Sequence, residues 1–141
     1  MPNTTVMQAK RLGVLSCTPG TTLSDAAQRM TDEDVSALVV VDEEGYLVGV
    51  LSRTDLLRAW DKGGPWAERT VGQYMSTQVV TVGLSTTLGE VVDLLLNERI
   101  HRVVVVRSEG DRMRPVGVVA AADIVYHMVK LEARARSTES A

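Results

Sequence analysis

The sequence contains a single cysteine, Cys17, and no phenylalanine, and only 4% of its residues are aromatic. One cysteine cannot form an internal disulfide or a cysteine-based metal site, so we expect Cys17 to be a small buried apolar side chain. The core must instead be built from valine, leucine, alanine, isoleucine and methionine. Because the valines are clustered, they predict buried strands.

Long apolar runs and a basic charge balance are also missing. No apolar run approaches the roughly 18–20 residues that span a membrane, and residues 1–5 lack the segments of a signal peptide. The net charge of −3 offers no basic surface for nucleic acid. We therefore expect a cytoplasmic protein that does not bind membranes, and the acidic charge balance disfavours nucleic-acid binding. Its 141 residues suffice for one domain or two very small ones.

The chain repeats itself. Residues 22–30 align with residues 87–95 at an offset of 65, and each segment begins with a threonine cap followed by an acid three positions later. The apolar residues in each segment have the spacing of one buried helix face. They are Leu23, Ala26, Ala27 and Met30 in the first copy, and Leu88, Val91, Val92 and Leu95 in the second.

Strands and a closing helix follow in both copies. Residues 35–41 align with residues 100–106, and each segment ends in a continuous apolar run, which predicts a strand covered on both faces. A turn leads to a second strand, and we place the three additional residues of the second copy in a longer surface loop. The last helix is predicted over residues 54–62 in the first copy and 122–134 in the second.

The predicted fold is α/β, with two pseudo-symmetric β–α–β–β–α repeats packed through their sheets. One copy of about 50–60 residues is marginal as a free-standing core, and a pair solves that problem. Short strands at 14–17 and 79–82 open the copies, and we expect residues 1–5 and 136–141 to be frayed. The predicted boundaries are a lead-in at 1–13, a first repeat at 14–62, a connector at 63–78, a second repeat at 79–131 and a C-terminal tail at 132–141.

A glycine-to-aspartate segment joins the last strand of each copy to its closing helix. It runs from Gly49 to Asp55 and from Gly117 to Asp123. Free backbone N–H groups and the helix dipole at such a turn favour an anion, and phosphate is the commonest anion in biology. The aspartate, one turn into the helix, could hold the hydroxyls of a sugar diol.

A structural role would also explain these segments. Ser52 and Asp55 have the spacing of a capping box, with a hydroxyl at the N-cap and an acid at N3. In the second copy Ala120 has no hydroxyl, yet Asp123 keeps its place, and the helix dipole alone favours an acid there. The segments therefore indicate a site without proving one.

The order of these elements resembles tandem CBS domains, a pair known as a Bateman module. The resemblance rests on the repeat, on the Thr-Val-x-x-x-x-Thr-Leu stretch from Thr81 to Leu88 and on the two glycine-to-aspartate segments, and it covers about residues 14–131. It implies a ligand-sensing module and not an enzyme. CBS pairs commonly bind AMP, ADP, ATP or S-adenosylmethionine. Which of them binds here, and whether magnesium accompanies ATP, stays open.

The resemblance also implies site residues. In the family the motif aspartate holds ribose hydroxyls, which here would be the role of Asp55 and Asp123. The motif hydroxyl lies near phosphate; Ser52 fits this pattern, whereas the second copy departs from it. The hydroxyl residue of each opening strand, Ser16 or Thr81, would contact base or ribose.

The stretch from Ile100 to Val103 resembles the Ile/Val-His-Arg-Leu stretch of the gamma subunits of AMP-activated kinase, in which the histidine and arginine reach phosphates. Arginine supplies paired donors for phosphate oxygens, and histidine can donate from a ring nitrogen. In the family, basic residues of one repeat can serve a ligand held by the other. We therefore predict one phosphate-bearing site, with a weaker or phosphate-free site at Asp123. The predicted site combines Ser52 and Asp55 with His101 and Arg102.

Two of these assignments have structural alternatives. His101 and Arg102 also fit an exposed polar pair leading into a strand, and Arg53 could reach phosphate or point into solvent. The full set of candidate ligand-binding residues is Ser16, Ser52, Arg53, Thr54, Asp55, Thr81, His101, Arg102 and Asp123.

Three functions compete. The first is a regulatory protein that binds an adenosine-containing ligand, changes shape or dimer geometry, and acts on an unidentified partner protein. Tandem pairs of the family often form homodimers, and we expect the final helix to contribute to one here. The second is an interaction scaffold with decayed sites. An enzyme is disfavoured, because the sequence has no nucleophile–base set, no metal-ligand cluster and no Walker loop.

Overall fold

The structure is a computed structural model, and it describes residues 3–9 and 13–140. The chain forms two compact units. The first unit comprises Val14–Val79 together with Ser108–Pro115. The second unit comprises the N-terminal segment up to Gly13, Val80–Arg107 and the chain from Val116 onward. Each unit contains most of one predicted repeat, and the elements follow the same order in both, so the internal duplication is confirmed.

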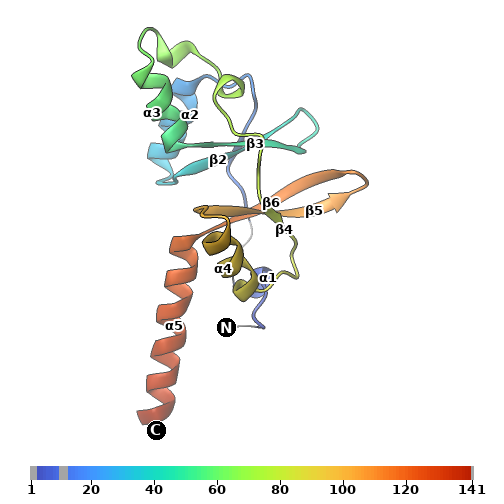
Figure 1. The fold of residues 1–141 in the computed structure, drawn as a ribbon, viewed down its shortest axis with the longest axis vertical. Coiled ribbons are helices and arrows are strands. Elements are labelled where there is room, and N and C mark those ends of the chain that lie inside the picture. Colours follow the sequence, from blue (N-terminus) through green and yellow to red (C-terminus); the bar gives the residue numbers. More distant parts are fainter. Residues whose placement is uncertain (1–2, 10–12, 141) are drawn as a thin grey trace. The chain divides into compact units, whose positions relative to one another are not determined.

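The first unit contains one β–α–β–β–α repeat, followed by a connector with two short 3₁₀ helices, Trp66–Glu68 and Val71–Gln73. The elements of the repeat are β1 (Ser16–Cys17), α2 (Leu23–Asp32), β2 (Ala37–Val41), β3 (Leu47–Ser52) and α3 (Arg53–Asp61) (Figure 1). In the three-stranded sheet, β2 pairs in parallel with β1 and antiparallel with β3. The predicted helix begins where expected, because the Thr22 side chain accepts a hydrogen bond from the Asp25 N–H.

The second unit repeats this order and adds an N-terminal helix. Its elements are α1 (Val6–Ala9), β4 (Thr81–Val82), α4 (Leu88–Asn97), β5 (Arg102–Glu109), β6 (Arg112–Ala120) and α5 (Ala121–Ser140) (Figure 1). The sheet order is β4-β5-β6, with β4 parallel to β5. The expectation that residues 1–5 fray was wrong for Thr4 and Thr5: the Leu88 N–H donates to the Thr4 carbonyl at 2.8 Å, and Thr5 forms a β-bridge with Thr87.

The C-terminal helix is longer than predicted. We expected it to end near residue 134 and residues 136–141 to fray, but α5 continues to Ser140. Its last turns contain helix formers and neither glycine nor proline, and Arg136 pairs with Glu132 one turn earlier at 3.2 Å. In the part of the chain that the structure describes, no helix, α5 included, is long and apolar enough to cross a membrane. Residue 141 lies outside the described residues.

The three additional residues of the second copy do not form a longer loop, as we had expected. They lengthen β5 and β6, which are joined by the two-residue turn Gly110–Asp111. Gly110 has a φ of 68°, which glycine adopts without steric cost, so a tight turn suffices and the added residues join the sheet. The tip of this hairpin, Ser108–Pro115, belongs to the first unit.

Each unit has its own core of aliphatic side chains, drawn from the sheet and from the buried face of its first repeat helix. Leu23, Ala26 and Met30 of α2 are buried as predicted, and Val103–Val106 of β5 are covered throughout. Cys17 is buried in the first core, as predicted; burial raises the pKa of its thiol, and the charge of Arg29 opposes that effect.

Candidate functional site

The turn between β3 and α3 is a closed capping box. Ser52 is the N-cap residue, and the Asp55 carboxylate Oδ2 accepts hydrogen bonds from the Ser52 backbone N–H at 2.8 Å and from its hydroxyl at 3.0 Å. The Ser52 hydroxyl in turn accepts from the Asp55 N–H at 3.4 Å. Asp55 is only 7% exposed. The structural interpretation of these two residues is therefore confirmed, and it leaves a buried, oriented carboxylate at the start of α3.

The other oxygen of this carboxylate has a partner on the same helix. Arg58 Nη1 lies 2.9 Å from Asp55 Oδ1, one turn further along α3. The Arg58 side chain is 68% exposed, whereas that of Asp55 is 9% exposed. The two oxygens of this buried carboxylate thus have different partners: the capping residue Ser52 on one and an exposed arginine on the other.

The backbone N–H groups of this turn are less available to an anion than the sequence suggested. The Arg53 N–H donates to the Ser36 carbonyl at 3.0 Å, and the Asp55 N–H is taken by the Ser52 hydroxyl. The Arg53 side chain is exposed and lies 3.6 Å from the Asp34 carboxylate, and Thr54 is exposed. Arg53 and Thr54 therefore stand at the surface beside Asp55, with Arg53 in a loose ion pair.

The glycine that opens the segment has a packing role. A Cβ on Gly49 would lie 2.8 Å from the Ser76 carbonyl oxygen and 2.9 Å from the Met75 sulfur. The next residue, Val50, exchanges two backbone hydrogen bonds with Ser76, each of 2.9 Å. Gly49 thus lets the connector approach β3 closely, and the motif glycine need not contact a ligand to be explained.

The second repeat builds the same turn without the hydroxyl. The Ala120 N–H donates to Asp123 Oδ2 at 2.7 Å, and the Ala121 N–H donates to the His101 carbonyl at 3.1 Å. This last bond corresponds to that between Arg53 and Ser36 in the first repeat. His101 therefore lies at the start of α5, close to the turn that holds Asp123, with its side chain exposed, and the partly buried Arg102 follows as the first residue of β5.

Two of the remaining candidates, Asp123 and Thr81, line different hollows of the second unit. Asp123, Tyr126 and His127 line a hollow of about 190 Å³ whose other walls are apolar side chains of α1, α4, β6 and α5. Thr81 lines a different, open hollow of about 510 Å³ beside α4, together with Glu90 and Asp93. Thr81 and Asp123 therefore line different hollows of this unit.

Ser16, the corresponding residue of the first repeat, lies in β1 opposite Val39, and its carbonyl accepts a hydrogen bond from the Arg29 guanidinium. Asp55 and Ser52 belong to the first unit, whereas His101 and Arg102 belong to the second. Their combination in one site stays a prediction. Within the described ranges, no three potential ligands among His, Cys, Asp and Glu gather as a metal site would require.

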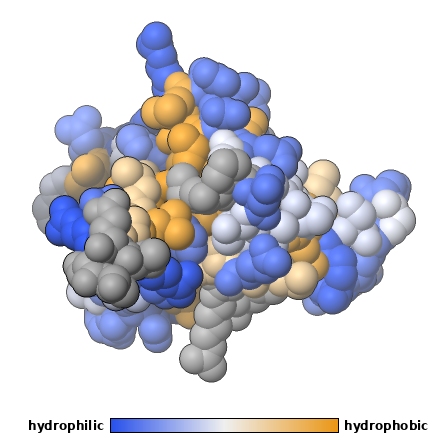
Figure 2. Space-filling view, turned by 90° about the horizontal axis from the view of Figure 1, so that it is seen from below, coloured by the Kyte–Doolittle hydropathy of each residue, from blue (hydrophilic) through white to orange (hydrophobic). Residues whose placement is uncertain are grey.

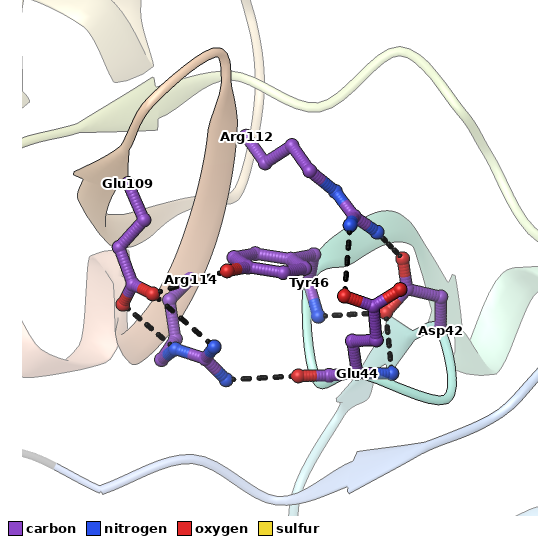
Figure 3. Close-up of polar contacts among 6 residues, drawn as sticks. All are labelled: Asp42, Glu44, Tyr46, Glu109, Arg112 and Arg114. Carbon is purple, nitrogen blue, oxygen red and sulfur yellow. Dashed lines mark hydrogen bonds and ion pairs between the residues drawn. The ribbon is translucent and has the colours of Figure 1, made fainter.

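A cluster of charged residues in the first unit was missed by the sequence interpretation. Arg112 of the hairpin tip pairs with Asp42 and, at 3.1 Å, with Glu44, and Arg114 pairs with Glu109 at 2.8 Å (Figure 3). The sequence did contain a signal for this cluster: arginines alternate at positions 112 and 114 of a strand, and acids alternate at positions 42 and 44 of a turn. Since the side chains of the cluster pair with one another, a structural contact explains it.

Comparison with known proteins places these observations in a family. The sequence profile of the CBS domain matches residues 6–62 and 71–130. An arabinose 5-phosphate isomerase from Pseudomonas aeruginosa is 32% identical over 106 residues, which cover 75% of this chain and 32% of the isomerase. The gamma-3 subunit of the pig (Sus scrofa) 5′-AMP-activated protein kinase is 33% identical over 105 residues, 70% of this chain and 20% of the subunit. The chain thus spans about a third or less of these two relatives.

Solved structures show the same fold over almost the whole chain. CBSX2 in complex with AMP superposes with a TM-score of 0.79 at 25% identity, covering 90% of this chain and 97% of that one. The CBS domain pair of protein MJ0100, in complex with 5′-methylthioadenosine and S-adenosyl-L-methionine, superposes with a TM-score of 0.80 at 24% identity, covering 92% of this chain and 98% of that one.

Proposed function

Because this chain belongs to the CBS-domain family and carries two CBS domains in tandem, we propose that it is a non-catalytic regulatory module that binds an adenosine-containing ligand. The observation that carries the proposal is the buried carboxylate of Asp55, held in a defined orientation by Ser52 at the start of α3. The AMP complex of CBSX2 and the similarity to an AMP-activated kinase subunit support an adenine nucleotide as the ligand.

The chemistry of Asp55 suits a ribose. A vicinal diol presents two O–H donors, and an ionised carboxylate accepts hydrogen bonds on both oxygens. Hydrogen bonds to a charged acceptor contribute about 1.5–3 kcal/mol each, more than bonds between neutral groups. Because Asp55 is buried, its orientation is fixed before a ligand arrives, which lowers the entropic cost of binding.

The phosphate of such a ligand would be held by His101 and Arg102. The proposal assigns ribose recognition to Asp55 in the first repeat and phosphate recognition to these two basic residues in the second. The Asp123 turn lacks a hydroxyl at Ala120, so we propose a weaker site there, for a ligand that carries no phosphate. Magnesium would enter only together with ATP, bound to its phosphates.

We further propose that the chain forms a homodimer through α3 and α5. Leu57 and Trp60 on α3 are 67% and 66% exposed, and Val125 and Met128 occupy the corresponding positions on α5, 55% and 53% exposed. Figure 2 shows hydrophobic side chains exposed among polar ones on the face seen from below. Grouped exposed apolar side chains mark interaction surfaces, and their duplication at equivalent positions favours a symmetric partner. A ligand that binds two dimer geometries unequally would shift the equilibrium between them, and a partner protein would sense the change.

A thermal-unfolding screen tests the ligand proposal. AMP, ADP, ATP with and without magnesium, and S-adenosylmethionine are compared with GTP as a control. A ligand at about 100 times its Kd should stabilise the protein by roughly 2.7 kcal/mol, which raises the Tm by several degrees for a chain of this size. The rise should be lost in Asp55→Ala and Arg102→Ala. A rise lost only in Asp123→Ala would move the site to the second repeat.

The alternative function is an interaction scaffold with degenerate sites. It is favoured by the missing hydroxyl at Ala120 and by the fact that both Asp55 oxygens already have partners within the chain. Under this alternative, none of the ligands would raise the Tm at millimolar concentration. Sedimentation or light scattering would still detect the dimer, and Trp60→Glu would weaken it.

A further inference from the structure

We infer that Arg58 competes with the ribose of the ligand for Asp55 and thereby sets the affinity of the site in the first repeat. The inference rests on the proposed function, since it concerns the same carboxylate. It assigns a role to a residue outside the glycine-to-aspartate segment, three positions after its last residue. Arg58 sets affinity because its contact with Asp55 must break before a diol can bind to that carboxylate.

The hydrogen-bonding capacity of Asp55 carries the argument. An ionised carboxylate has about four acceptor sites on its two oxygens. On Oδ2, two of them are filled by the N–H and the hydroxyl of Ser52, at 2.8 and 3.0 Å. On Oδ1, one is filled by Arg58 Nη1 at 2.9 Å. A ribose that donates from both hydroxyls needs two sites and finds one, so at least one existing contact must break.

The contact that breaks most easily is the one to Arg58. The contacts to Ser52 cap the N-terminus of α3, so breaking them would open the capping box and take the Asp55 acceptor from the Ser52 backbone N–H. Arg58 is 68% exposed, and its guanidinium regains water as soon as it turns away. Ion pairs that water reaches shift an equilibrium only about two- to fivefold, and water reaches the Arg58 end of this pair. Displacing Arg58 therefore lowers diol affinity by that factor and does not abolish binding.

The corresponding position of the second repeat holds no basic residue. Tyr126 occupies the position three residues after Asp123 that Arg58 occupies after Asp55. Tyr126 carries no positive charge, and its ring is 67% exposed with the Lys130 ammonium 5.5 Å from its centroid. The two repeats therefore differ three positions after their aspartates: the first has an arginine that pairs with Asp55, and the second has an aromatic residue.

Titration calorimetry with adenosine tests the inference, because adenosine has the diol and no phosphate for Arg58 to contact. Arg58→Ala should bind adenosine about two- to fivefold more tightly than the unchanged protein. Salt screens exposed ion pairs, so raising the ionic strength from about 0.01 M to about 1 M should tighten adenosine binding to the unchanged protein and leave the variant nearly unaffected. A merely structural role for Arg58 would produce neither change. Lys62→Ala, which removes the same charge from an exposed residue at the end of α3, should behave like the unchanged protein.

2′-Deoxyadenosine provides a second readout. It lacks one of the two hydroxyl donors, so its remaining hydroxyl can use the one free acceptor site of Asp55 without displacing Arg58. The Arg58→Ala substitution should therefore improve the binding of 2′-deoxyadenosine less than that of adenosine. Equal or weaker adenosine binding in Arg58→Ala would overturn the inference while the proposed function stands, provided Asp55→Ala still abolishes binding. If neither the unchanged protein nor Arg58→Ala binds adenosine, AMP, ADP, ATP or S-adenosylmethionine, the proposed function fails and the inference fails with it.

Discussion

The guanidinium carbon of Arg112 lies 4.0 Å from the centroid of the Tyr46 ring, and the same guanidinium pairs with Asp42 (Figure 3). Arg114 lies 4.5 Å from the same centroid, and the Tyr46 hydroxyl donates to Glu109 at 3.2 Å. The turn after β2 and the tip of the hairpin between β5 and β6 are thereby joined in one unit, although about 70 residues of sequence separate them.

Replacing Tyr46 should loosen this contact. Tyr46→Ala removes the ring that two guanidinium groups share, and each cation–π contact near the surface contributes about 0.5–1 kcal/mol. We expect a loss of about 1–2 kcal/mol in the free energy of unfolding, measured by urea denaturation. Tyr46→Phe keeps the ring and should lose less. A Tyr46→Ala variant as stable as Tyr46→Phe would show that the ring contributes nothing.

Acid should weaken the same contact through Asp42. The Tyr46 backbone N–H is the largest cause that lowers the pKa of Asp42; the Glu44 N–H and Arg112 add to it, and desolvation opposes it. A carboxylate whose folded pKa is depressed stabilises the fold above its unfolded value of about 3.9, and this contribution is lost as pH falls through the folded pKa. The free energy of unfolding, measured between about pH 5 and 2, should therefore decline less steeply with falling pH in Asp42→Asn than in the unchanged protein. An identical slope would contradict the assignment.

Gly49 should tolerate no side chain. In Gly49→Ala the new methyl group would lie 2.8 Å from the Ser76 carbonyl, so β3 or the connector must shift, at a cost of about 1–3 kcal/mol. Gly20 is the matched control, since a Cβ there would meet nothing within 4 Å. Thermal unfolding of both variants checks the prediction, which fails if Gly49→Ala is as stable as Gly20→Ala.

The N-terminal helix should stabilise the second unit. Val6 of α1 is fully buried in the core of that unit, so Val6→Ala should cost about 1–3 kcal/mol in urea denaturation. Met7, the next residue, is 58% exposed, and Met7→Ala should change stability by less than about 0.5 kcal/mol. Equal effects of the two substitutions would mean that α1 is not part of the core.

The elements of both repeats could be predicted because their signals are local. Thr22 and Thr87 each cap a helix whose buried face follows within ten residues, and the glycine-to-aspartate segments mark two strand-to-helix turns. What could not be predicted depends on contacts distant in sequence. The pairing of Thr5 with Thr87 and the anchoring of Arg112 on Asp42 involve residues whose own neighbours give no sign of their partners.

In the candidate site, too, the local contacts could be predicted and the contacts distant in sequence could not. The Ser52–Asp55 capping box was predictable from spacing alone, and so was the reach of Arg58 to Asp55, because residues three apart meet on a helix. The local prediction was wrong about which N–H groups are available. The Arg53 N–H donates to the carbonyl of Ser36, which lies just before β2 and which no spacing rule identifies. The joining of Asp55 with Arg102 rests on the resemblance and not on local sequence.

Calorimetric titration with AMP of the unchanged protein, Asp55→Ala and Asp25→Ala tests the central claim most directly. Asp25 is the matched control, because it stands at the same capping position of α2 and is exposed. We predict saturable AMP binding that Asp25→Ala leaves unchanged and Asp55→Ala weakens at least about tenfold, as the loss of charged hydrogen bonds requires. Equal affinity in all three proteins, or no binding at millimolar AMP, would contradict the account.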